Sequence, residues 1–166
     1  AKSIPINFKI YVKDHIHGHL RGWRDIKQYK EIKELPNVVL IHPSYSSKKL
    51  IKNCKLIISV NGGGSTIEAA SENKPAIIFG DMPIDVLPSI YKIKTLERLP
   101  ELIKIALKTT INPEYFKKYN QLIIKNKINF NWDELEILRN EQFYSGNILS
   151  DVEYPENKVK EFFEKN

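Results

Sequence analysis

The sequence contains a single cysteine, Cys54, among 166 residues, and no hydrophobic run of the 18 or so residues that a membrane span needs. One cysteine cannot form an internal disulfide, which excludes a disulfide-stapled secreted fold and favours a reducing, cytoplasmic location. The first residues, Ala1–Pro5, lack the apolar core of a signal peptide. They also lack an initiator methionine, so we expect the chain to be a piece of a longer protein. With 42% hydrophobic residues, it has enough apolar material for a globular core.

Basic residues are concentrated near the N-terminus. The formal charge is +6, but residues 1–60 alone hold 12 Lys/Arg against 4 Asp/Glu. Such an excess favours an anionic partner, namely phosphate groups, nucleic acid or an anionic membrane surface. A solvated lysine-rich surface is the alternative. No recognised nucleic-acid motif or series of stacking aromatics is present, so we do not expect nucleic-acid binding.

Short apolar runs alternate with helical patterns as far as about residue 110. The sequence predicts strands at 8–12, 37–41, 56–60, 75–79 and 89–93, with helices at 25–35, 48–53, 67–73 and 96–108. This alternation is typical of an α/β fold, with a Rossmann-like parallel sheet of about five strands and helices on both faces. We therefore expect a nucleotide-binding half at 1–110. Residues 111–166 would form a helical extension packed on it, with helices at 114–128, 132–143 and 156–163.

The most informative stretch is glycine-rich and lies between the third strand and its helix. Glycine allows close backbone approach, and a helix N-terminus offers N–H groups and partial positive charge to a phosphate. Glu68 is then placed to accept hydrogen bonds from a ribose diol. The alternative is a tight turn with a hydroxyl N-cap and Glu68 as its capping-box partner. The glycine spacing fits neither a Walker A loop nor a dinucleotide fingerprint. The residues expected to bind the phosphates are Gly62, Gly63, Gly64, Ser65 and Thr66.

A histidine-rich segment follows the first strand. His15, His17 and His19 alternate, which is the spacing of a shared face in extended chain. No cysteine or acidic cluster nearby completes a metal site, so we expect no metal. Lys13 and His15 are instead predicted to border the same cleft as the glycines, where they would contact a diphosphate or protonate a leaving phosphate. His17 and His19 are expected to be exposed loop residues.

Two further loops follow strands and complete the expected rim. After the second strand come His42 and Pro43, where Pro43 and Tyr45 could pack on a base while backbone groups read its edge. An ordinary strand–helix connection is the alternative there. After the fourth strand, Asp81 and Asp85 are predicted to bind sugar hydroxyls, although Asp81 could simply begin a turn.

Residues 56–79 resemble the donor-binding signature of the GT-B superfamily of nucleotide-sugar enzymes. The run from Gly63 to Pro75 resembles the Gly-Gly…Glu-Ala…Gly-Lys-Pro run of non-hydrolysing UDP-N-acetylglucosamine 2-epimerases and the equivalent loop of the peptidoglycan N-acetylglucosaminyltransferase. The closer likeness is to capsule polysaccharide biosynthesis proteins. It rests on Lys13–Ile16, Leu35–Val38, Leu50–Lys52, Gly64–Ala69, Lys74–Gly80 and Ile84–Pro88.

Three positions depart from these patterns. Ile16 replaces a proline, Val60 stands where retaining GT-B families have a glutamate, and Asn73 replaces a glycine. The second departure weakens a retaining mechanism that uses an acidic pair. The third is conservative, because asparagine tolerates the left-handed backbone conformation.

The resemblance implies the C-terminal, donor-binding domain of a GT-B glycosyltransferase of surface or capsular polysaccharide biosynthesis. The donor would be a UDP- or CMP-linked sugar, bound without metal or other cofactor. Lys13 and His15 would serve catalysis, and a missing N-terminal domain would bind the glycan acceptor and supply its base, so the chain alone should not catalyse transfer. A location at the inner face of the membrane, with peripheral association, is a further expectation. The alternatives are half of a 2-epimerase-like enzyme and a non-catalytic anion-binding module.

Overall fold

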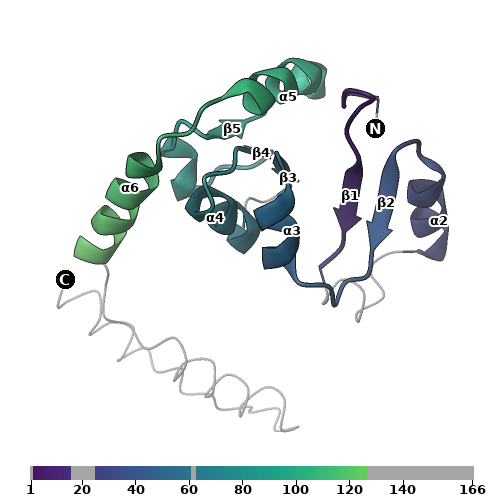
Figure 1. Ribbon diagram of the computed structural model, residues 1–166, viewed down its shortest axis with the longest axis horizontal. Coiled ribbons are helices and arrows are strands. Elements are labelled where there is room, and N and C mark those ends of the chain that lie inside the picture. The colour runs from purple at the N-terminus through teal and green to yellow at the C-terminus, as the bar shows by residue number, and fades with distance from the viewer. Residues whose placement is uncertain (1, 16–24, 61–62, 127–166) are drawn as a thin grey trace, which may run out of the picture. The chain divides into compact units, whose positions relative to one another are not determined.

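The computed structural model describes residues 2–15, 25–60 and 63–126 (Figure 1). Contacts divide the chain into a compact unit, Ala1–Lys125, and a second unit, Asn126–Asn166. In the first unit, strands and helices alternate along the chain. The elements are β1 (Ile10–Lys13), α2 (Ile26–Glu34), β2 (Val38–Ile41), α3 (Ser47–Asn53), β3 (Ile57–Ser59), α4 (Gly63–Ser71), β4 (Ala76–Ile78), η1 (Pro83–Val86), β5 (Ile90–Lys92), η2 (Leu96–Arg98), α5 (Leu99–Lys108) and α6 (Pro113–Lys125).

The strands β3, β4 and β5 form a parallel sheet in that order. The central strand β4 reads Ala-Ile-Ile and is buried over its whole length. A strand covered on both faces must be apolar throughout, which is why this run shows no alternation with polar residues. Successive side chains point to opposite faces, so Ile77 and Ile78 belong to different cores.

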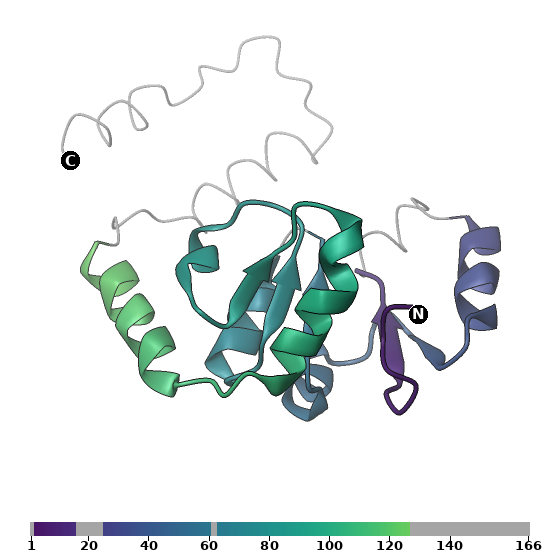
Figure 2. The same cartoon turned by 90° about the horizontal axis from the view of Figure 1, so that it is seen from above.

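Helices cover both faces of this sheet, as the sequence predicts. On one face Ile78 and Ile90 pack with residues of α3 and α4, and Phe116 of α6 packs against the same cluster. On the other face Ile77 packs with Ile103 of α5. Figure 2 shows α5 in front of the three strands. The α/β class with parallel strands is therefore confirmed.

β1 and β2 form a separate two-stranded parallel sheet, with Ile10 opposite Val38 and Lys13 opposite Ile41. The sequence predicts about five strands in one sheet. In the described residues no hydrogen-bonded ladder joins the two sheets, and β3 pairs with β4 alone. Among the described strands, β4 is buried throughout, whereas neither β1 nor β2 contains a buried residue.

Two helices begin at a short polar side chain that caps their first turn. The carboxylate of Asp25 accepts a hydrogen bond from Lys27 N at 3.1 Å and begins α2. The hydroxyl of Ser46 accepts from Lys49 N at 3.4 Å and begins α3. Each oxygen satisfies one of the N–H groups that a first helical turn leaves without an internal acceptor.

Asn73 ends α4 in the left-handed conformation, with φ 54°. Lys74 N donates to Ala69 O at 2.8 Å, and Asn73 N donates to Ala70 O at 3.1 Å. These two bonds are the 6→1 and 5→2 pair of a Schellman motif. Asparagine therefore fills the position where the resembled families have glycine, as expected.

α6 begins at Pro113, where the fixed φ of proline suits a first helical residue. It ends at Lys125, three residues before the predicted end. Phe116 and Tyr119 attach it to the core, while the helices predicted at 132–143 and 156–163 lie outside the described residues. Within the described part of the chain, no helix is long and apolar enough to cross a membrane.

Candidate functional site

The carboxyl ends of β3, β4 and β5 lie at one edge of their parallel sheet. In open α/β sheets ligands bind beyond this edge. The chain places three groups at this edge: the start of α4 after β3, Asp81 after β4, and Lys92 at the end of β5. These groups form the candidate site.

The helix α4 begins at Gly63, four residues earlier than the sequence predicts. Thr66, Ala69 and Ala70 are its buried residues. Their i, i+3, i+4 spacing forms one helical face, so packing of Thr66 draws the preceding residues into the first turn. The alternative in which the hydroxyl of Ser65 or Thr66 caps the helix is therefore wrong, because both residues are inside it.

The first three helical residues are Gly63, Gly64 and Ser65. In an α-helix the N–H groups of these positions have no acceptor within the helix. They carry the positive end of the helix dipole, which suits an anion. This segment can therefore still bind a phosphate, as the sequence predicts, but through the N–H groups of a first helical turn rather than through a loop.

Neither glycine is required by the fold. A Cβ atom built on Gly63 or Gly64 meets no atom of the described residues within 4 Å beyond its own helix and chain neighbours, and neither glycine has a positive φ. Glycine in a helix costs up to about 1 kcal/mol relative to alanine. The glycines therefore leave open space beside exposed N–H groups without improving packing or relieving a turn.

Thr66 and Glu68 differ in their access to this space. Thr66 is fully buried, and its hydroxyl oxygen has no hydrogen-bond partner within the part of the chain that the structure describes. Glu68 is exposed and lies about 7.5 Å along the helix axis from Gly63, at 1.5 Å per residue. It is thus outside the first turn, and the alternative in which it serves as a capping-box partner is wrong.

Asp81 and Asp85 are brought together by Lys92. The Nζ of Lys92 lies 2.5 Å from Asp81 Oδ1 and 3.1 Å from Asp85 Oδ2. The hydrogen bond from Lys92, followed by its charge, lowers the pKa of Asp81. The hydrogen bonds that Lys92 donates to Asp81 and Asp85 raise the pKa of Lys92, against a smaller opposing effect of desolvation. The side chain of Asp81 is 90% exposed and that of Asp85 only 23%, so Asp81 presents the more open carboxylate.

Lys92 was not predicted from the sequence. The short strand expected at 89–93 could have indicated it, because a lysine near the end of a parallel strand lies at the same edge of the sheet as the loop after the neighbouring strand. Lys92 is the register partner of Ile78, the last residue of β4, so it lies next to the segment that leads from β4 to Asp81.

The segment after β1 is held by Asp14. Its Oδ1 accepts from the backbone N of His15 at 2.9 Å, and its Oδ2 accepts from the hydroxyl of Tyr29 on α2 at 2.9 Å. Lys13 Nζ lies 3.5 Å from the carbonyl oxygen of Asp14. The predicted residues Lys13 and His15 are therefore neighbours at the carboxyl end of β1. The anchoring roles of Asp14 and Tyr29 were missed, because nothing in the spacing relates them.

The segment after β2 is a tight turn. His42 Nδ1 lies 2.7 Å from Ser44 Oγ and accepts from Ser44 N at 3.3 Å. The carbonyl of His42 accepts from Tyr45 N at 2.9 Å. Pro43 is half-buried and Tyr45 is exposed. Since Lys13 pairs with Ile41, this turn and His15 lie at the same edge of the two-stranded sheet. That this turn and His15 border the same cleft as the start of α4 stays a prediction.

Other predicted positions fall outside the site as described. Gly62, His17 and His19 lie outside the described residues. Among residues 2–15, 25–60 and 63–126, no three His, Cys, Asp or Glu side chains gather where they could hold a metal ion. A hollow lined by Pro88, Ser89 and Tyr115, among others, lies before β5, at the opposite edge of the sheet.

Comparisons with protein-family models, with curated proteins and with solved structures gave no match to this chain. The resemblance to GT-B enzymes therefore stays a prediction, and the geometry of the start of α4 is the firmest ground for a function.

Proposed function

We propose that this chain is the nucleotide-sugar-binding domain of a GT-B-type glycosyltransferase that acts in surface or capsular polysaccharide synthesis. The observation that carries the proposal is the start of α4, where Gly63 and Gly64 leave space beside free N–H groups at the carboxyl edge of a parallel sheet. A diphosphate fits this site because it needs several converging donors and close backbone approach.

In catalysis such a site would stabilise the leaving group. In glycosyl transfer the acceptor oxygen forms a bond to the anomeric carbon, and the bond from that carbon to the phosphate oxygen breaks. The departing nucleoside diphosphate takes the electron pair and gains negative charge. The N–H groups of Gly63, Gly64 and Ser65 are fixed donors for that charge. A base supplied by another domain would accept the proton of the acceptor hydroxyl.

The remaining residues are proposed to surround the donor. Asp81, with its open carboxylate, is suited to sugar hydroxyls, and Lys92 holds it at the rim. Lys13 and His15 would reach the diphosphate if the sheets β1–β2 and β3–β5 act as halves of one Rossmann-like domain. Metal is not needed in this arrangement, because the helix and a lysine supply the positive charge.

Thermal unfolding with added nucleotides tests the proposal. UDP, CMP and GDP, their sugar conjugates and the free nucleosides form the series. A ligand at a hundred times its dissociation constant stabilises the folded state by about 2.7 kcal/mol. We expect UDP- or CMP-linked sugars to raise the unfolding temperature, and nucleosides without phosphate to have little effect. If no nucleotide shifts the transition of a folded sample, or nucleosides act as well as diphosphates, the proposal fails.

A further inference from the structure

The helical layer made of α3, α4 and α6 is unusually basic. α4 contacts both α3 and α6, and the three helices cover the same face of the three-stranded sheet. Together they carry six lysines against two glutamates, a net charge of +4, whereas α5 on the other face carries two lysines and one glutamate. The six residues, called the α3–α6 lysines below, are Lys48, Lys49, Lys52, Lys117, Lys118 and Lys125.

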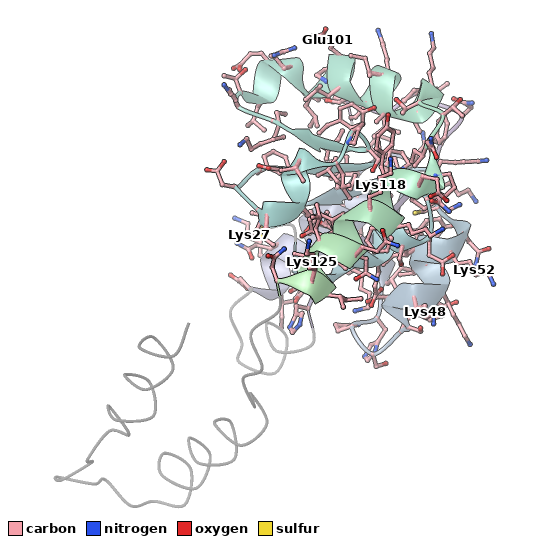
Figure 3. All side chains as sticks on the ribbon, turned by 90° about the vertical axis from the view of Figure 1, so that its left-hand side faces the viewer. Lys27, Lys48, Lys52, Glu101, Lys118 and Lys125 are labelled. Carbon is pink, nitrogen blue, oxygen red and sulfur yellow. The ribbon has the colours of Figure 1, made fainter. Side chains whose placement is uncertain are left out.

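All six of these lysines are exposed. Within the described residues, the ion pair found on this layer joins Lys117 to Glu114 at 3.7 Å. Figure 3 shows Lys48 and Lys52 on α3 and Lys118 and Lys125 on α6, all on the side that faces the viewer. Residues four or seven apart share a helix face, so each pair presents its charges in one direction.

Large apolar side chains are exposed on the same layer. Ile123 and Ile124, next to Lys125 in the last turn of α6, are 49% and 56% exposed. Ile67 of α4 is 46% exposed. A phosphate backbone offers such side chains nothing, whereas a lipid interface offers anionic headgroups to lysine and hydrocarbon to isoleucine.

We propose that the α3–α6 face docks on an anionic lipid surface, with Ile123 and Ile124 entering the headgroup boundary. α6 has 13 residues and is about 20 Å long, which suits a helix lying along the interface rather than across it. This inference goes beyond donor binding and does not depend on it, since it uses side chains of the helical layer and not the N–H groups of Gly63 and Gly64.

Flotation of the full chain with vesicles tests the proposal. One set of vesicles is pure phosphatidylcholine, and the other contains one third phosphatidylserine. We expect binding to the second set alone, weakened by added salt as the screening length shortens. A basic residue near an anionic bilayer contributes about fivefold to affinity. The variant Lys48→Gln/Lys52→Gln/Lys118→Gln/Lys125→Gln should therefore lose roughly a hundredfold or more.

Two matched variants separate this surface from net charge. Lys104→Gln/Lys108→Gln removes charge from α5 and should leave vesicle binding unchanged. Ile123→Ser/Ile124→Ser keeps every charge and should remove the part of the binding that survives in high salt. Each variant is first shown to unfold cooperatively.

Several outcomes overturn the proposal. Equal binding to both vesicle sets, or an equal loss in the α5 variant, removes the role of the α3–α6 lysines. Stronger binding to an oligonucleotide that is unaffected by Ile123→Ser/Ile124→Ser points to nucleic acid instead. A dimer in solution that is dispersed by the same two serines points to a second copy of the chain. None of these outcomes affects the shift of the unfolding temperature by nucleotides, so the two proposals fail separately.

Discussion

Replacing Gly63 and Gly64 with alanine should separate folding from ligand binding. Alanine favours a helix over glycine by about 0.8–1.0 kcal/mol in a helix interior, and by less in a first turn. The added methyl groups meet no atom of residues 2–15, 25–60 or 63–126 within 4 Å outside their own helix, so no steric cost from this part of the chain opposes the gain. We therefore expect each single variant to be as stable as the parent chain or more stable, by up to about 1 kcal/mol.

The same methyl groups fill the space beside the N–H groups of the first turn. A phosphate bound there must move away from the added methyl group, so its hydrogen bonds to the N–H groups lengthen. A hydrogen bond to a charged group contributes about 1.5–3 kcal/mol, so loss of one weakens nucleotide binding by roughly 10- to 100-fold. Urea unfolding measures the first effect, and titration calorimetry with the nucleotide that stabilises the parent chain measures the second.

Ser71→Ala is the matched control. Ser71 is the last residue of the same helix, and its hydroxyl donates to Glu68 O at 2.8 Å. Its replacement raises helix propensity at the other end of α4 and should leave nucleotide affinity unchanged. The reasoning is refuted if Gly63→Ala and Gly64→Ala bind nucleotide as tightly as Ser71→Ala. It is also refuted if they unfold more easily than the parent, since the glycines would then be structural.

Three further predictions concern the surroundings of this helix. Thr66→Val removes a buried hydroxyl without a partner, so stability should rise by about 1 kcal/mol and the unfolding temperature by roughly 2–4 °C in calorimetry; a loss of stability would show that the hydroxyl is bonded. Asn73→Ala places a Cβ-bearing residue that lacks a polar side chain at φ 54° and should cost about 1 kcal/mol in urea unfolding, whereas Asn73→Gly should cost nothing. The pKa of Asp81 is lowered from its ordinary value of 3.8 and that of Lys92 is raised from its ordinary value of 10.5, so their pairing stabilises the fold between pH 3.8 and pH 10.5. The difference in unfolding temperature between the parent and Lys92→Gln should therefore vanish as pH falls below the first value or rises above the second, and a difference that persists in acid would contradict the pairing.

Features that depend on neighbouring residues were well predicted from the sequence. The helices predicted near 25–35 and 48–53 form where expected, and each begins at a short polar side chain, Asp25 or Ser46, that precedes the helical pattern. Asn73 closes α4 for a similarly local reason. The apolar strands were also found, since β4 is covered on both faces and its residues must all be hydrophobic.

The errors arose where distant contacts overrule local preference. Glycine has low helix propensity, so residues 63–64 were expected to be loop, but burial of Thr66 with Ala69 fixes the helix through them. The pairing of Lys92 with Asp81 needs the register of β4 against β5, which no local pattern contains. The arrangement of five strands into two separate ladders has the same origin, because short parallel strands carry little information about their neighbours.

Two kinds of positive charge serve the two proposed ligands, and salt distinguishes them. The start of α4 offers directed N–H groups on Gly63 and Gly64, which bind a phosphate at hydrogen-bond distance, where screening by salt is weak. The α3–α6 lysines act across solvent, and their attraction falls once the screening length drops to about 3 Å near 1 M salt. Nucleotide affinity should therefore decline gently with salt, while vesicle binding should fall steeply to the part that Ile123 and Ile124 contribute. If both declined together, with the same steepness, the lysines would be the nucleotide's ligands and the glycines of α4 would have no part in binding.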